Sequence, residues 1–298
     1  MKVLIAGLLR RSSGKTTLAL ALAKYLRELG YVVGVFKPLS VHNWYYQYDT
    51  SVENVKERLL FSEDIMKLAR AVRTKLPYDV LNPVHGVIFP PNPLLLRYKL
   101  VARYYLYLED RLMAMPLVRF TLCSDVKTNV YAVNREVLNR DHLYYDPDYI
   151  SSVLESANIV LDVYTTEQMY KVMEIYAPAS ILSCYSHLKR SSDVTIIESF
   201  SNVAAPSVHV LDVDLVLIIG PGVVMTYDGR SYSKAILLYS SLRSVVDIST
   251  QDIVNLVSPL KVFSVSPLLK DDLLNSLRLV TKFKSILSFI ERKLREER

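Results

Sequence analysis

The apolar positions of the first forty residues predict a strand, a loop, a helix and a second strand. Residues 2–6 form a short apolar run, which is typical of a buried strand. From Gly14 onward, apolar residues recur at helical spacing until Gly30, and residues 31–36 form another apolar run. This order predicts a βαβ unit, in which a right-handed crossover joins two parallel strands.

Strand-like runs return in the second half of the chain. They lie at 159–161, 194–197, 214–219 and 262–265, with helical stretches between them. Nearly continuous apolar strands that alternate with helices favour a parallel sheet covered on both faces. We therefore expect a three-layer α/β/α fold with a mostly parallel sheet, formed by residues 1–298 as a single domain.

The middle of the chain departs from this alternation. The pattern there predicts a helix over 62–74, an irregular proline-rich loop over 77–93, a helix over 94–115, and a β-hairpin of 118–122 with 129–133. We expect residues 93–149 to be an insertion or subdomain within the domain. The charged and apolar positions of 270–298 indicate an amphipathic helical tail.

Composition narrows the function classes. The chain has 36 Lys and Arg against 30 Asp and Glu, a net charge of +6, which permits anionic ligands but falls short of a dedicated nucleic-acid binder. No uncharged run reaches the ~18 residues of a membrane helix, so we expect no membrane partner and a cytoplasmic location. The small number of glutamines suggests a thermophilic source.

The two cysteines, Cys123 and Cys184, belong to no CxxC pair. Their number excludes a disulfide framework and a zinc site. We therefore expect two buried free thiols in a reducing compartment.

The strongest chemical signal is Gly14-Lys15-Thr16, placed after a buried strand and before a helix. Backbone amides around the glycine can wrap a phosphate, the lysine can reach the terminal phosphates, and the threonine hydroxyl can hold Mg²⁺. The strict pattern G-x-x-x-x-G-K-[ST] requires glycine at position 9, where this chain has Leu9; the nearest upstream glycine is Gly7. The sequence thus predicts a lengthened phosphate loop that binds ATP with Mg²⁺.

Nucleotide contacts are expected along this loop, from Arg11, Ser12, Ser13, Gly14, Lys15, Thr16 and Thr17. Arg10 and Arg11 are each open to two interpretations. An arginine in such a loop can touch a γ-phosphate, as in other phosphoryl transfers, or it can point into water.

Four stretches together resemble dethiobiotin synthetase and its relatives among the P-loop NTPases, which include ParA/MinD-type ATPases and cobyrinate amidases. They are the phosphate loop 7–16, the Lys37-Pro38 pair after the second strand, the segment 62–68 with Asn82-Pro83 and Pro90-Pro91, and the strand end at 195–199. The resemblance covers roughly the first hundred residues and 193–267.

The resemblance implies roles for several side chains. Mg²⁺ would be held by Thr16, Asp64 and Glu198, with Asp49 as a fallback ligand; hard oxygen ligands of this kind suit the ion. Lys15 and Lys37 would be the catalytic lysines, the first gripping the β- and γ-phosphates and the second stabilising the migrating phosphoryl group. Pro267 would lie in the segment that contacts adenine, and a homodimer is possible.

Each of these side chains also has a plainer explanation. An acid such as Asp64 at a helix N-terminus stabilises that helix unaided. A glutamate after a strand can be a surface carboxylate, and a lysine before a turn proline can simply be exposed. The cluster of Trp44 with Tyr45, Tyr46 and Tyr48 could stack on a substrate or pack a loop.

The departures from the family pattern fall in its substrate half. Residues 199–202 replace a glycine-rich run, and bulky residues at 41–46 replace small polar ones. We expect an ATP- and Mg²⁺-dependent phosphoryl-transfer enzyme, ligase- or cyclo-ligase-like, which activates a carboxylate or carbamate of a small-molecule substrate for C–N bond formation. The alternative is a nucleotide-gated switch ATPase that acts on a protein partner.

Overall fold

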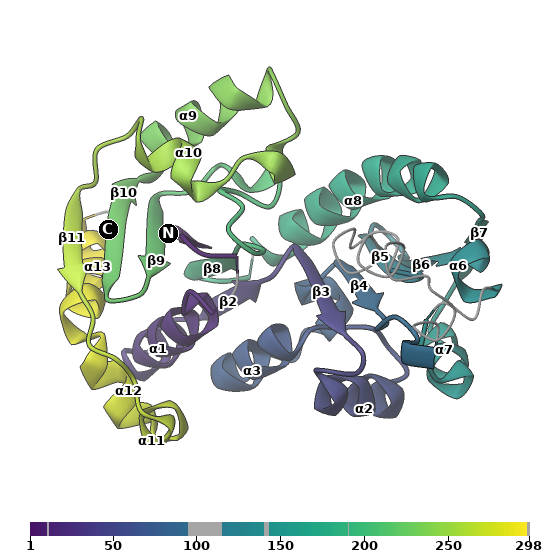
Figure 1. Cartoon of the computed structure of the whole chain (residues 1–298). Helices are drawn as coiled ribbons and strands as arrows, with labels where there is room; N and C mark the ends of the chain where they lie inside the picture. The colour runs from purple at the N-terminus through teal and green to yellow at the C-terminus, as the bar shows by residue number, and fades with distance from the viewer. Residues whose placement is uncertain (11, 95–114, 140–142, 190, 297–298) are drawn as a thin grey trace. The chain divides into compact units, whose positions relative to one another are not determined.

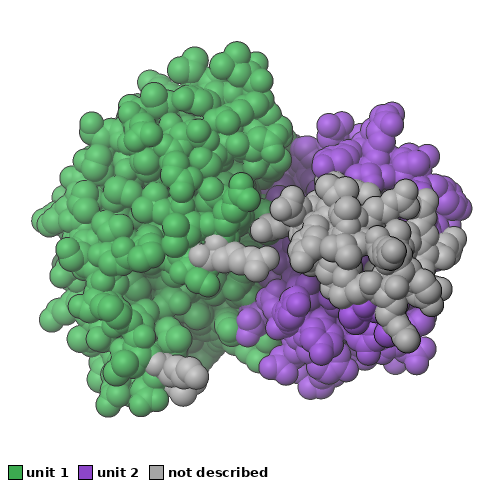
Figure 2. Space-filling model, in the orientation of Figure 1, with its two compact units in different colours: residues 1–38, 64–76, 185–298 green, residues 39–63, 77–184 purple. Residues whose placement is uncertain are grey.

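The computed structural model describes residues 1–10, 12–94, 115–139, 143–189 and 191–296 (Figure 1). The chain divides into two compact units, coloured separately in Figure 2: unit 1 is Met1–Pro38, Asp64–Leu76 and Tyr185–Arg298, and unit 2 is Leu39–Glu63 and Pro77–Cys184. Each unit is built on its own β-sheet. The protein is therefore mixed α/β, and it has a second sheet that the sequence pattern did not predict.

The sheet of unit 1 has six strands in the order β11-β10-β9-β1-β8-β2. Their bounds are β1 Lys2–Gly7, β2 Val33–Phe36, β8 Val194–Glu198, β9 Leu215–Gly220, β10 Val223–Asp228 and β11 Lys261–Ser264. Neighbours among β9, β1, β8 and β2 run parallel, whereas β10 is antiparallel to both β9 and β11. The initial strand–helix–strand order is confirmed, and so are the four later strands, as β7 (Ile159–Val163), β8, β9 and β11; β7 belongs to the sheet of unit 2, and β10 was not predicted.

The parallel part of this sheet is apolar and almost completely buried. Residues 3–6 of β1 and 216–218 of β9 are wholly inaccessible to solvent. The helices of unit 1 are α1 Lys15–Glu28, α3 Glu63–Val72, α9 Gly229–Ser240, α10 Thr250–Val254, α11 Lys270–Leu274, α12 Ser276–Lys282 and α13 Lys284–Glu296. Of these, α9 packs on β9 and β10. Helix α1 packs on β1, β2 and β8 (Figure 1), so the helix that follows the predicted phosphate loop is anchored to the centre of the sheet.

The sheet of unit 2 has five strands in the order β3-β4-β5-β6-β7. The bounds are β3 Leu39–Asn43, β4 Val84–Ile88, β5 Leu117–Cys123, β6 Lys127–Asn134 and β7 Ile159–Val163, with helices α2 Tyr48–Glu57, α4 Tyr78–Leu81, α6 Arg135–Asn139, α7 Pro147–Leu154 and α8 Thr166–Leu188. Strands β5 and β6 form the predicted hairpin. Unit 2 reaches well beyond the insertion expected at 93–149.

The irregular loop predicted over 77–93 is wrong, because this segment contains α4 and β4. Its prolines delimit these elements rather than interrupt them: Pro77 is the N-cap of α4, Pro83 immediately precedes β4, and Pro90 follows its end. The helix predicted over 94–115 falls almost entirely outside the described residues.

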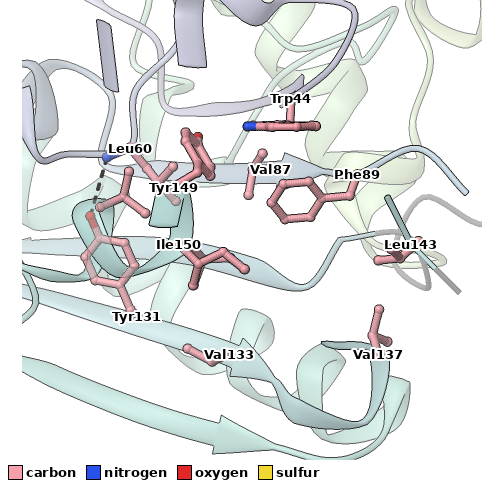
Figure 3. Packing of buried hydrophobic residues seen from close by; sticks show 12 residues of the cluster. Trp44, Leu60, Val87, Phe89, Tyr131, Val133, Val137, Leu143, Tyr149 and Ile150 are labelled. Atoms are coloured by element: carbon pink, nitrogen blue, oxygen red, sulfur yellow. Dashed lines mark hydrogen bonds between the residues drawn. The ribbon is translucent and has the colours of Figure 1, made fainter. Parts of the chain in front are cut away.

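The core of unit 2 is a mixed aromatic and aliphatic cluster, shown in Figure 3. Trp44 and Phe89 pack together with ring centroids 5.7 Å apart, and Tyr149 lies against both rings. The buried hydroxyl of Tyr131 accepts a hydrogen bond from the backbone N–H of Leu60 at 3.4 Å. These contacts make unit 2 a body with a hydrophobic core of its own.

The prediction of two free thiols is wrong, because Cys123 and Cys184 form a disulfide. Cys123 ends β5 and Cys184 lies on α8, and the fold brings their Cα atoms to 4.8 Å. The cysteine count therefore no longer argues for a reducing compartment; disulfides also occur in intracellular proteins of hyperthermophiles. In the part of the chain that the structure describes, no helix has both the length and the apolarity to cross a membrane.

Candidate functional site

The segment between β1 and α1 turns sharply into the helix. Gly14 has φ 95°, in the left-handed region that glycine occupies without strain, and Ser12 has φ 53°. No side chain caps α1, no acid lies in its first turn, and its first backbone bond runs from Leu18 N to Gly14 O. The N–H groups of residues 15–17 thus have no acceptor within the helix, and this end of α1 suits an anion.

Gly7 makes the lengthened loop possible. A Cβ at Gly7 would collide with Ser13 Oγ and lie 3.0 Å from Lys15 Nζ. The ammonium of Lys15 donates to Ser13 Oγ at 3.2 Å and to the carbonyl of Ser201 at 2.6 Å. Burial lowers the pKa of Lys15, and the nearby charge of Lys37 lowers it further. Position 7 is therefore a place in this loop where a side chain would press against Ser13 and Lys15.

Three oxygen-bearing side chains meet next to this loop. Thr16 lies at the start of α1, Asp64 in the first turn of α3, and Glu198 at the end of β8. The Thr16 hydroxyl is 2.9 Å from Asp64 Oδ1 and 2.9 Å from Glu198 Oε1, so its single proton can be donated to either carboxylate. The structure thus brings together the three residues for which a shared Mg²⁺ is expected.

Lys37 completes the cluster from the end of β2. Its ammonium donates to Asp64 Oδ2 and to Glu198 Oε1, both at 2.6 Å. The side chain of Lys37 is 5% exposed, that of Glu198 1% and that of Asp64 35%. Lys37 is therefore a buried partner of both carboxylates and not the exposed lysine of the plainer explanation.

The pKa values of the cluster show a balance of burial and charge. Burial alone would lower the pKa of Lys37, but the two carboxylates raise it above its usual value. Burial would raise the pKa of Asp64, yet the Lys37 ammonium holds it below the usual range. For Glu198, burial outweighs Lys37, and its pKa is raised.

The donor set fits a nucleotide-bound magnesium ion. Glu198 Oε2 is buried and has no hydrogen-bond partner, so one carboxylate oxygen remains unsatisfied. Among the described residues, no group of three or more His, Cys, Asp or Glu side chains could hold a metal ion. Mg²⁺ does not need such a group, since it usually takes one or two carboxylates and completes its shell with phosphate oxygens and water.

The remaining predicted site residues take no part in the hydrogen bonds described above for this cluster. Asp49, the fallback ligand, is exposed on α2 in unit 2. Arg11 falls outside the described residues. Ser12 is exposed and Thr17 half-buried in the loop, and Pro267 is exposed after β11.

Three residues from distant parts of the chain hydrogen-bond to the loop between β1 and α1, and the sequence did not indicate them. Ser201, whose carbonyl accepts from Lys15, also donates its hydroxyl to Arg10 O at 3.2 Å and has φ 52°. Thr250 donates to Gly7 O at 2.7 Å, and Gln251 donates to Leu8 O at 2.5 Å. Ser201 lies within 199–202, where the family that the chain resembles has a glycine-rich run. A glycine-rich run favours the left-handed backbone conformation, so the resemblance could have indicated the positive φ of Ser201.

No protein-family model matches the chain, and no curated protein is found to match it. Any functional assignment therefore depends on the chemistry of the site itself.

Proposed function

We propose that unit 1 binds a nucleoside triphosphate, with ATP the first candidate, together with Mg²⁺ and uses it for phosphoryl transfer. One observation carries this proposal: Lys15, Thr16, Lys37, Asp64 and Glu198 gather in a single cluster although they come from four separate segments of the chain. Strands β1, β8 and β2 are parallel neighbours and their carboxyl ends meet at one edge of the sheet, where open α/β sheets bind ligands.

The side chains divide the work in a way that suits this chemistry. The N–H groups at the start of α1 and the ammonium of Lys15 would hold the phosphates. Thr16, Asp64 and Glu198 would hold the magnesium ion, which when bound neutralises phosphate charge. Lys37, beside the same carboxylates, would stabilise charge on the migrating phosphoryl group. Phosphoryl transfer needs little beyond positioning and such charge stabilisation.

The proposed reaction is the activation of a carboxylate or carbamate. Its oxygen attacks the γ-phosphorus of ATP, the bond to the β-phosphate oxygen breaks, and ADP leaves. An amine then attacks the acyl carbon and forms the C–N bond, the bond from this carbon to the phosphate oxygen breaks, and the inorganic phosphate that leaves takes up the proton lost by the amine. Resemblance to dethiobiotin synthetase supports this ligase-like assignment, and the buried Lys37 supports a reacting centre near the phosphate loop.

Binding can be tested with the full chain. ATP or GTP with Mg²⁺ at a hundred times the Kd should raise the free energy of unfolding by about 2.7 kcal/mol in a thermal-shift assay. Lys15→Ala should abolish this gain, whereas the control Lys75→Ala, which changes an exposed lysine of the same unit, should leave it unchanged. Absence of any shift with either nucleotide would refute the proposal.

A nucleotide-gated switch is the second candidate. Tyr45, Tyr46, Tyr48 and Tyr144 in unit 2 are each more than half exposed, and an exposed aromatic cluster of this kind is typical of a surface that meets a protein partner. Steady-state ADP release separates the two candidates. In an enzyme, carboxylate or amine substrates should raise the rate of ADP release. In a switch, ADP release should be slow, and these compounds should not change its rate.

A further inference from the structure

The ammonium of Lys37 occupies the space between the two carboxylates that would hold a metal ion. It lies 2.6 Å from Asp64 Oδ2 and 2.6 Å from Glu198 Oε1. The latter oxygen is also the one that Thr16 reaches at 2.9 Å. Without nucleotide, the cluster therefore has a cation of its own, supplied by the chain.

Charge repulsion disfavours this ammonium and a magnesium ion on the same oxygens. A magnesium ion bonds oxygen at about 2.0–2.1 Å. An ion that bound Glu198 Oε1 while Lys37 stayed in place would bring two positive centres against one buried atom, with little water to screen them. While Lys37 stays on Asp64 Oδ2 and Glu198 Oε1, its charge therefore opposes the binding of a metal ion to these two oxygens.

We propose that Lys37 holds the place of the divalent metal and yields it only to nucleotide and metal together. This inference rests on the proposed function of the same site. A triphosphate at the start of α1 offers the ammonium new anionic partners. When Lys37 turns to the phosphates, it frees Asp64 Oδ2 and Glu198 Oε1, and the metal ion also satisfies the unpartnered Glu198 Oε2. Binding of the metal is thereby coupled to binding of the nucleotide.

The test measures Mn²⁺ binding to the full chain by electron paramagnetic resonance, with no nucleotide present. Lys37→Met keeps the length of the side chain and removes its charge, and Lys75→Met is the matched control at an exposed position. We expect Lys37→Met to bind one Mn²⁺ at least tenfold more tightly than the wild type and the control. Adding Asp64→Asn to Lys37→Met should remove this gain.

Two outcomes overturn the inference. One is an Mn²⁺ affinity of Lys37→Met equal to that of the wild type; the other is tight Mn²⁺ binding by the wild type when no nucleotide is present. If Lys37→Met does not fold, Lys37→Gln also removes the charge, and it should show the same tenfold gain in Mn²⁺ affinity without nucleotide. The variant assay needs no nucleotide, so it is separate from the test of the proposed function. If the protein binds ATP but Lys37→Met does not bind Mn²⁺ more tightly, this inference is refuted and the proposed function stands.

Discussion

Reduction of the disulfide should destabilise unit 2 by several kilocalories per mole. Cys123 and Cys184 are separated by 61 residues along the chain, and both belong to unit 2. In the chain-entropy model, a cross-link over a loop of this length removes about 14 cal/mol/K from the unfolded state, or about 4 kcal/mol at 25 °C. The backbone N–H of Cys123 donates a hydrogen bond to Ser183 Oγ at 3.0 Å, and this bond involves no sulfur. We expect it to persist on reduction, so the loss of loop entropy dominates the change in stability.

The assay uses the single tryptophan of the chain. Trp44 is 7% exposed in the core of unit 2, so its fluorescence reports unfolding of that unit (Figure 3). In urea titrations of the wild type, a phosphine reductant should move the unfolding transition of unit 2 to a lower urea concentration. The double variant Cys123→Ser with Cys184→Ser should start at the lower value and ignore the reductant. If the Trp44 transition stays in place while mass spectrometry shows two free thiols, the loop-entropy reasoning fails.

Two further predictions concern the phosphate loop and the buried histidine of unit 2. Gly7→Ala places a methyl group against Ser13 Oγ and near Lys15 Nζ. Calorimetry should show weaker ATP binding, and the free energy of unfolding should fall by roughly 1–3 kcal/mol. An unaltered ATP affinity would contradict the loop geometry. Burial lowers the pKa of His42 to about 3. The unfolded chain takes up this proton near pH 6.5, so stability is full above that pH and falls by up to about 1.4 kcal/mol per unit toward pH 3. In urea titrations, His42→Gln should flatten the dependence of the free energy of unfolding on pH between about pH 6.5 and pH 3. Parallel pH dependences for variant and wild type would show that His42 does not cause the loss of stability.

The sequence predicts five of the six strands of unit 1, because their buried positions mostly carry apolar residues; it misses β10 (Val223–Asp228), whose residues alternate between buried and partly exposed. Strand β3 shows the opposite case: its buried positions are Ser40 and His42. His85 of β4 lies 2.6 Å from Ser40 Oγ through Nδ1 and 2.7 Å from His42 Nδ1 through Nε2. A buried polar position that hydrogen-bonds to another strand looks exposed in the sequence, so the hydrophobic pattern indicated β5, β6 and β7 but missed β3 and β4, and with them the separate second sheet.

The candidate site was predictable to the extent that it follows from the sheet. Lys37 and Glu198 directly follow or end strands β2 and β8, and parallel neighbours place such residues at one edge. Asp64 has no such constraint, since it lies on a helix whose position no local pattern defines; only the family resemblance suggested it. The disulfide was missed for the same reason, because pairing of Cys123 with Cys184 depends on where α8 packs.

A buried ammonium between two carboxylates needs an explanation beyond stability. Replacing buried ion pairs by well-packed apolar side chains is often neutral or stabilising, so folding alone gives little reason to retain one. Unit 2 offers a comparison: Asp79 also has a buried oxygen without a partner, but its other oxygen is held by Lys127 at 2.6 Å and Asn129 at 3.0 Å. What sets the cluster around Lys37 apart is a second carboxylate and the Thr16 hydroxyl, both next to a helix start that suits an anion. This combination, and not the unsatisfied oxygen by itself, is the reason to propose phosphate and metal chemistry for unit 1.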